Sequence, residues 1–176
     1  MVDSQHVLPT AGPEPELLGI YLNDHLAGSA GGLELARRLA GSHRNTAAAK
    51  DLAWLVEQVA EDRETMTRFM EQLGIARTRY KEPLAWLAEK AGRLKPNGHL
   101  LSRSPLSSVV ELEGMILGVT GKMAAWRTLR VLADNDVRLD PAMIDHLIVR
   151  AEEQIDRLEH LRVRAVAEAF VPARPT

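Results

Sequence analysis

Apolar residues recur every three to four positions along four long stretches of the chain, which is the period of an amphipathic α-helix. The stretches cover residues 16–40, 46–74, 105–133 and 141–170. The first apolar stripe consists of Leu18, Leu22, Leu26, Leu33, Ala36 and Ala40. The second consists of Leu52, Leu55, Val56, Val59, Met66, Met70 and Leu73. The pattern therefore predicts an all-α protein with four long helices.

Local signals at the helix ends agree with these boundaries. Ser104-Pro105 and Asp140-Pro141 each place a capping side chain before a proline, a residue that is favoured in the first helical turn. Gly74 closes the second stretch, and glycine is common just beyond a helix C-terminus. Two of the four helices thus have strong start signals, and one has a clear stop.

The lengths of the connections predict how the helices are arranged. Short links join the first helix to the second and the third to the fourth, so each pair should form an antiparallel hairpin. The long connection, residues 75–103, can run the length of the bundle and contains a short helix, PLAWLAEKAGRL. We expect one four-helix-bundle domain over residues 16–170, with tails at 1–15 and 171–176. The short helix should pack on the outside of the bundle through Leu84, Leu87, Ala88 and Leu94.

Composition narrows the class of protein. A chain of 176 residues that is 45% hydrophobic can bury a sizeable core, and a formal net charge of −2 creates no field that attracts nucleic acid or anionic membranes. The absence of cysteine excludes disulfides, thiolate zinc sites and cysteine nucleophiles. The sequence has neither a signal-peptide pattern nor the run of about 18 apolar residues typical of a membrane span. We therefore expect a cytoplasmic protein that binds neither membranes nor nucleic acid.

Ionisable residues interrupt the apolar stripes of three predicted helices. On a helical wheel His25 lies among leucines, Arg63 lies within the second stripe with Asp62 at its edge, and Glu113 lies among valine, isoleucine and leucine side chains. Buried charges are costly unless they are paired. The pattern predicts a buried polar network of His25, Asp62, Arg63 and Glu113.

A metal site in the bundle core is the alternative use of the same residues. His25, Asp62 and Glu113 offer nitrogen and oxygen ligands for iron, manganese or zinc, with Glu57 or Asp24 as a further ligand. Arg63 argues against this, because a fixed cation competes with a metal. His25 and Glu113 are also level in the bundle only if their two helices start at the same end.

The layout of residues 16–170 and the inward acids and histidine resemble the ferritin-like four-helix-bundle family. That family places one carboxylate on each of two helices and a Glu-x-x-His pair on each of the other two. Residues 56–65, VEQVAEDRET, contain no histidine, and Glu153, Asp156 and His160 lie on the polar side of the last helix, so a complete diiron site does not carry over. The phrases YLNDHLAG, VELEG and GRLKPNG are also similar to a group of helical proteins from high-GC actinobacteria, a likeness that implies no activity.

Three further features leave alternatives open. Gly28, Gly31 and Gly32 permit either close helix approach or a small-ligand cavity. The stretch RLKPNGHLLSR at 93–103 is either a solvated basic loop or an anion site. Trp54 and Trp126 project away from the main stripes and are predicted to pack under the short helix, against Trp86, or at a dimer contact.

We expect a non-enzymatic structural or interaction protein with an internal polar network. The simplest assembly is a homo-oligomer, such as a dimer. A ferritin-like metal-binding protein with a degenerate core site and a small-ligand carrier are the alternatives.

Overall fold

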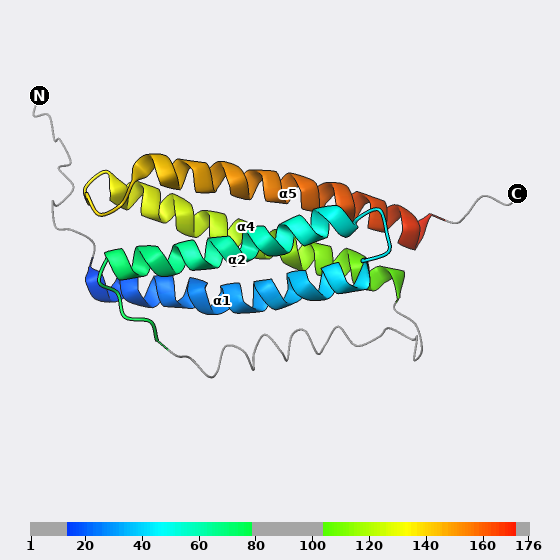
Figure 1. Ribbon diagram of the computed structural model, residues 1–176, viewed down its shortest axis with the longest axis horizontal. Helices are drawn as coiled ribbons and strands as arrows, with labels where there is room; N and C mark the ends of the chain where they lie inside the picture. Colours follow the sequence, from blue (N-terminus) through cyan, green and yellow to red (C-terminus); the bar gives the residue numbers. More distant parts are fainter. Residues whose placement is uncertain (1–13, 79–103, 172–176) are drawn as a thin grey trace, which may run out of the picture.

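The computed structural model describes residues 14–78 and 104–171, and these form four long helices (Figure 1). The helices are α1 (Pro15–Ser42), α2 (Ala49–Gln72), α4 (Pro105–Ala133) and α5 (Pro141–Phe170). The described residues contain no strand, so the predicted all-α, four-helix class is confirmed for this part of the chain. None of these helices combines the length and hydrophobicity that crossing a membrane requires. The predicted short helix at 83–94 lies outside the described residues.

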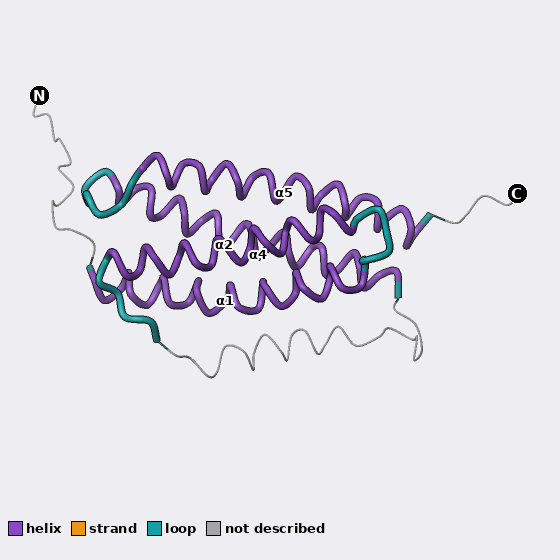
Figure 2. The backbone as a smooth tube through the Cα atoms, in the orientation of Figure 1, coloured by secondary structure: helices purple, strands orange, loops and turns teal. Residues whose placement is uncertain are grey.

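The four helices pack side by side in a ring, with α1 against α2 and α4, and with α5 against α4 and α2. Helices α1 and α5 run in one direction along the bundle, and α2 and α4 run in the other (Figures 1 and 2). Consequently α2 ends at the opposite end of the bundle from the start of α4. The seam between α4 and α5 is the most extensive, and that between α2 and α5 is the least.

The helix ends follow the sequence signals in part. The Asp140 carboxylate accepts hydrogen bonds from the backbone nitrogens of Ala142 (2.9 Å) and Met143 (3.3 Å), so it caps α5 as predicted. Gly74 has a φ of 72°, which glycine adopts without strain, and confirms the predicted stop after α2. The buried Ser104 side chain makes no capping bond to α4, contrary to the prediction; its carbonyl oxygen accepts from the nitrogen of Ser107 instead.

The core is built from the predicted stripes and from aromatic side chains that the stripes did not include. Trp126 is fully buried and meets Phe69 edge to face with 6.0 Å between ring centroids, so the predicted dimer contact is wrong for this side chain, while the alternative, packing against Trp86, lies outside the described residues. Helix α4 is apolar around much of its circumference, so a helical wheel cannot show which of its sides faces the core. Trp54 is half-buried and lies under the Arg157 guanidinium, 4.1 Å from the ring centroid.

Candidate functional site

A buried ionic cluster lies where α2, α4 and α5 meet. Asp62 of α2 is 2% exposed, and its carboxylate accepts from Lys122 Nζ of α4 and from Arg150 Nη2 of α5. Gln154 Nε2 of α5 donates to the same carboxylate at 3.0 Å, while Gln154 Oε1 accepts from Lys122. Both Asp62 oxygens are therefore occupied by protein donors.

Helical spacing explains how these side chains converge. Arg150 and Gln154 are four residues apart on α5, so they project from the same face. Glu61 and Asp62 are adjacent on α2, and Arg150 bridges them, with Nη1 2.8 Å from the Glu61 carboxylate. Lys122 and Arg150 supply two positive charges and Glu61 and Asp62 supply two negative ones, so the cluster is electrically balanced.

Burial and pairing act in opposite directions on the two cations. Burial lowers the pKa of Lys122, and the neighbouring Asp62 offsets only part of this effect. Burial also disfavours the charged form of Arg150, but its hydrogen bond to the Glu61 carboxylate and the charge of Asp62 prevail and raise its pKa. Arg150 is thus fixed as a cation, whereas Lys122 carries its proton at a larger electrostatic cost.

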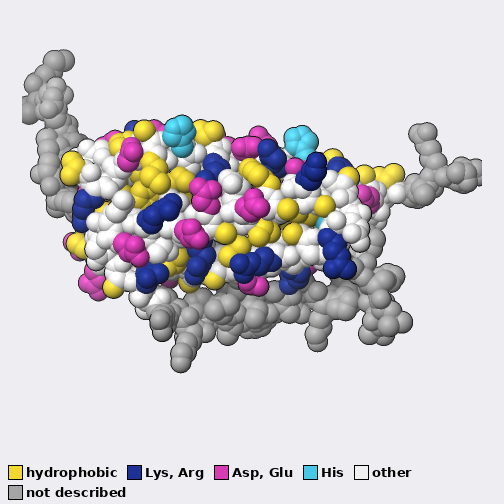
Figure 3. Space-filling view, in the orientation of Figure 1, with side chains coloured by type: hydrophobic (Ala, Val, Ile, Leu, Met, Phe, Trp, Pro, Cys, Tyr) yellow, Lys and Arg dark blue, Asp and Glu magenta, His cyan; other side chains and the backbone are white. Residues whose placement is uncertain are grey.

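The cluster borders an open groove. A cavity of about 790 Å³ lies between α2 and α5, and Glu61 and Arg150 belong to its wall. Its other charged or polar lining includes Gln58, Thr65, Arg68, His146 and Glu153. Figure 3 shows positive and negative side chains alternating over the face that contains α2 and α5. The groove therefore offers mixed, largely self-neutralised charge rather than a field of one sign.

His25 lies apart from this cluster. Its ring is half-buried and meets the Tyr21 ring edge to face with 4.6 Å between centroids, while the Tyr21 hydroxyl pairs with that of Thr128 at 3.1 Å. Burial lowers the pKa of His25, and Asp24 partly compensates. Tyr21 therefore links α1 to α4, and His25 packs against Tyr21 on its own helix.

Glu113 and Arg63 also depart from the predicted network. The Glu113 side chain is 51% exposed and pairs with Arg162 of α5 at 3.7 Å, so its predicted core position is wrong. Arg63 is half-buried, and its Nε has no hydrogen-bond partner among the described residues. The side of α2 that faces the core contains Asp62 and Thr65, and Arg63 lies beside it rather than on it.

No hydrogen bond or ion pair within the described residues joins any two of the four residues predicted to form the network, His25, Asp62, Arg63 and Glu113. The opposite directions of α1 and α4 account for part of this result. His25 lies in the first half of α1 and Glu113 in the first half of α4, toward opposite ends of the bundle. Glu153, Asp156 and His160 are exposed, as predicted.

Sequence reasoning missed Lys122, Arg150 and Gln154. The available signal was Lys122, the single charged residue of the segment 114–126. A single charged residue in an otherwise apolar helix has no polar side of that helix to lie on. It is therefore expected to be buried and paired with a group of opposite charge. Arg150 and Gln154 were missed because their stripe also contains Leu147, Ala151 and Leu158, which looked sufficient to define the inner face.

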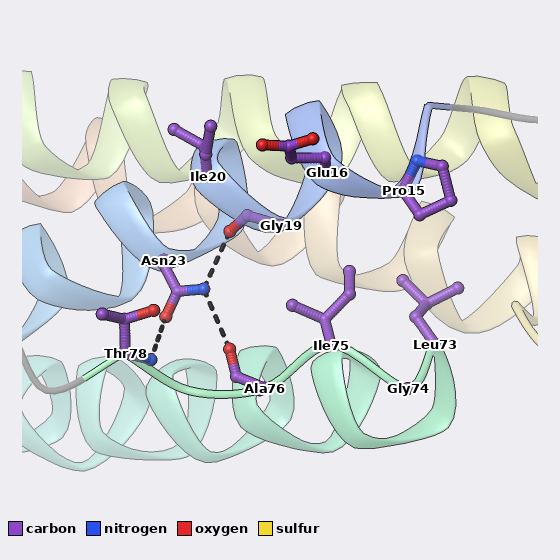
Figure 4. Close-up of a pocket in the computed structure, with 10 residues that line it drawn as sticks. All are labelled: Pro15, Glu16, Gly19, Ile20, Asn23, Leu73, Gly74, Ile75, Ala76 and Thr78. Carbon is purple, nitrogen blue, oxygen red and sulfur yellow. Dashed lines mark hydrogen bonds between the residues drawn. The ribbon is translucent and has the colours of Figure 1, made fainter.

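A second cavity, of about 380 Å³, lies beside the start of α1 and the chain that follows α2 (Figure 4). Asn23 dominates its polar chemistry. The Asn23 amide nitrogen donates to the carbonyls of Gly19 (2.8 Å) and Ala76 (3.1 Å), and its side-chain oxygen accepts from the nitrogen of Thr78 (2.7 Å). Asn23 thus fastens residues 76–78 onto α1, and its hydrogen-bonding groups are already engaged.

Two other predicted sites have different outcomes. Beside Gly28 and Gly32 an added Cβ meets nothing within 4 Å among the described atoms, and Gly28 is exposed, so this space lies at the surface. The basic stretch at 93–103 lies outside the described residues.

In the described parts of the chain, no three histidine or acidic side chains gather closely enough to hold a metal ion. The predicted ligands His25, Asp62 and Glu113 instead take part in three separate sets of contacts. A scan against protein-family models, a search of curated proteins and a search of solved structures each found no match to this chain.

Proposed function

We propose that this protein is a non-enzymatic helical bundle with a structural or interaction role, in which the chain supplies its own cations to the buried carboxylate. The observation that carries the proposal is the saturation of Asp62 by Lys122, Arg150 and Gln154. A carboxylate that accepts from an ammonium, a guanidinium and an amide has no free oxygen to offer a metal or a substrate. The cluster therefore acts as a structural lock between helices.

The helix directions support placing the chain with ferritin-like bundles. Two antiparallel pairs, with α2 ending at the opposite end from the start of α4, are what a lengthwise crossover requires. In this proposal, the Lys122 ammonium occupies core space that such bundles give to a metal ion. The bundle is then a degenerate relative that keeps the architecture and has replaced the inorganic cation by a side chain.

Metal analysis tests this proposal. The native protein, purified without a chelator or metal-affinity tag, should contain far less than one iron, manganese or zinc ion per chain and should not take up added Fe(II), Mn(II) or Zn(II). A His25→Ala variant should behave identically, because His25 contacts Tyr21 rather than the cluster. Near-stoichiometric metal that disappears in His25→Ala would refute the structural role and support the metal-binding alternative.

A small-ligand carrier is the second candidate, and the groove between α2 and α5 favours it. With about 790 Å³, this cavity falls in the usual range for small-molecule sites. Native mass spectrometry of the purified protein tests it. A retained small molecule that is lost in Arg68→Glu, a change in the groove wall, would support a carrier; protein of bare chain mass would contradict it.

A further inference from the structure

The outward side of α4 lacks the charges that normally cover a surface helix. Between Glu113 and Arg127 the sequence has one charged residue, Lys122, and that side chain points inward to Asp62. Leu117 is 73% exposed, and Thr120 and Ala124 are also exposed. A helix facing water on one side ordinarily carries charged or polar residues there. The outward side of α4 therefore has the residue composition of a protein–protein contact rather than of a side that faces water.

The outward side of α5 provides the internal comparison. It also exposes valines, with Val149 at 62% and Val163 at 54%. There, however, exposed Glu152 and Asp156 lie between the valines, and Glu152 pairs with Arg127 of α4 at 3.3 Å. The two faces thus differ in charge rather than in the number of exposed apolar side chains.

We propose that a second copy of this chain packs against the outward side of α4, with the two α4 helices antiparallel about a two-fold axis near Thr120. Two-fold pairing requires a surface complementary to itself. Glu113 and Arg127 lie at equal distances in sequence on either side of Thr120, and their side chains are 51% and 57% exposed. The axis therefore sets each glutamate opposite an arginine at both ends of the contact.

The centre of this face permits close approach. Thr120, Gly121 and Ala124 are small, and a Cβ added at Gly121 meets nothing within 4 Å among the described atoms. The Leu117 side chain of each copy can therefore lie over Gly121 and Ala124 of the other. Such an arrangement buries the large exposed leucine without displacing the backbone.

The size of the face sets the expected affinity. From Glu113 to Val131 the helix is about 27 Å long, at about 1.5 Å per residue. A single helical stripe of this length buries less than the roughly 800 Å² per partner of a standard stable interface. The dimer should therefore have a dissociation constant in the micromolar range. The inference is independent of the proposed role of the Asp62 cluster, because that cluster faces the other side of α4.

Sedimentation analysis of the full chain from about 1 to 200 µM brackets such an affinity and tests the proposal. The native protein should convert from monomer to dimer in this range. Leu117→Glu should weaken dimerisation at least tenfold, because it places a charge in the contact. Val149→Glu on α5 is the matched control and should dimerise like the native chain. Helical circular dichroism and thermal melting establish that both variants are folded.

Charge reversal tests the antiparallel register. Glu113→Arg and Arg127→Glu alone should each weaken the dimer, since each sets like charges opposite one another, and the double variant should restore it. Both residues are half-exposed, and their ion pairs within the chain contribute little to stability. A native protein that stays monomeric at about 200 µM, a dimer unaffected by Leu117→Glu, or a double variant as weak as the single ones would overturn the proposal.

Discussion

Replacing Lys122 by Met is the sharpest test of the buried cluster. The substitution keeps an unbranched side chain of similar length and removes the ammonium that donates to Asp62 and Gln154. Asp62 keeps Arg150 and Gln154 as donors, so it is not left alone in the core. The change therefore isolates one cation from the network without emptying the space it fills.

The structure sets the magnitude. Removing one partner of a fully buried ion pair costs about 3–5 kcal/mol. Two observations reduce that figure: the Lys122 side chain is 15% exposed, and Arg150 remains to balance the carboxylate. A hydrogen bond that involves a charged group contributes about 1.5–3 kcal/mol, and the Lys122 ammonium also donates one to the uncharged Gln154 Oε1. We expect Lys122→Met to lower the free energy of unfolding by about 2–3 kcal/mol.

Urea denaturation followed by circular dichroism measures this difference. With a slope of about 2 kcal/mol per molar urea, the midpoint should fall by about 1 M. Lys50→Met is the matched control, because Lys50 is exposed on α2, and its free energy of unfolding should stay within about 0.5 kcal/mol of the native value. Asp62→Asn combined with Lys122→Met should cost less than the two single changes added together, since the pair interacts directly. A loss below about 0.5 kcal/mol, or strict additivity, would refute the cluster as a lock.

Three further predictions address other features. Because burial lowers the folded-state pKa of Lys122 below the 10.5 of the unfolded chain, the unfolded state binds more protons between the two values. Native stability should therefore rise with pH across that window relative to Lys122→Met, which urea midpoints on the alkaline side measure; parallel profiles would contradict the burial effect. Asn23→Ala should cost about 1–3 kcal/mol and speed hydrogen exchange at the Thr78 amide, because the backbone groups of Ala76 and Thr78 lose their hydrogen bonds to the buried Asn23 side chain; unchanged exchange at Thr78 would contradict the clamp. Gly74→Ala should destabilise by about 1 kcal/mol, since Gly74 has a φ of 72°, whereas Gly28→Ala inside α1 should stabilise by about 0.5–1 kcal/mol; equal thermal shifts of the two variants would contradict this distinction.

The sequence predicted the helices better than it predicted which side of each helix faces the core. Apolar periodicity and the Asp140 and Gly74 signals located the elements, because these depend on nearby residues. Rotation of a helix about its axis depends on its neighbours. On α2 the buried residue is Asp62 and not its neighbour Arg63, and on α4 the nearly uniform hydrophobicity gives no preferred direction.

The cluster residues were difficult to find for the same reason. Asp62 was identified because it lies at the edge of the apolar stripe of its helix, beside Arg63. Arg150 and Gln154 instead lie on the same side of α5 as leucine and alanine residues. Only the three-dimensional arrangement shows that this side of α5 contacts α2 as well as α4. The acids of α2 are neutralised by cations from α4 and α5, so the pattern of a single helix does not reveal the pairing.

The position of the cluster also explains why the weakest seam of the bundle holds. Apolar packing joins α1 to α2, α1 to α4 and, most extensively, α4 to α5, while α2 and α5 touch only slightly and leave a groove between them. Asp62 and Glu61 reach across this seam to Arg150, and Lys122 ties Asp62 to α4. Arginine and lysine side chains are longer than the apolar side chains of the core, so their ion pairs can span a wider helix spacing and close the ring of helices where apolar packing does not. The groove and the buried charges are therefore two consequences of one spacing, and loss of the Asp62 pairs should separate α2 from α5 before it disturbs the other three seams.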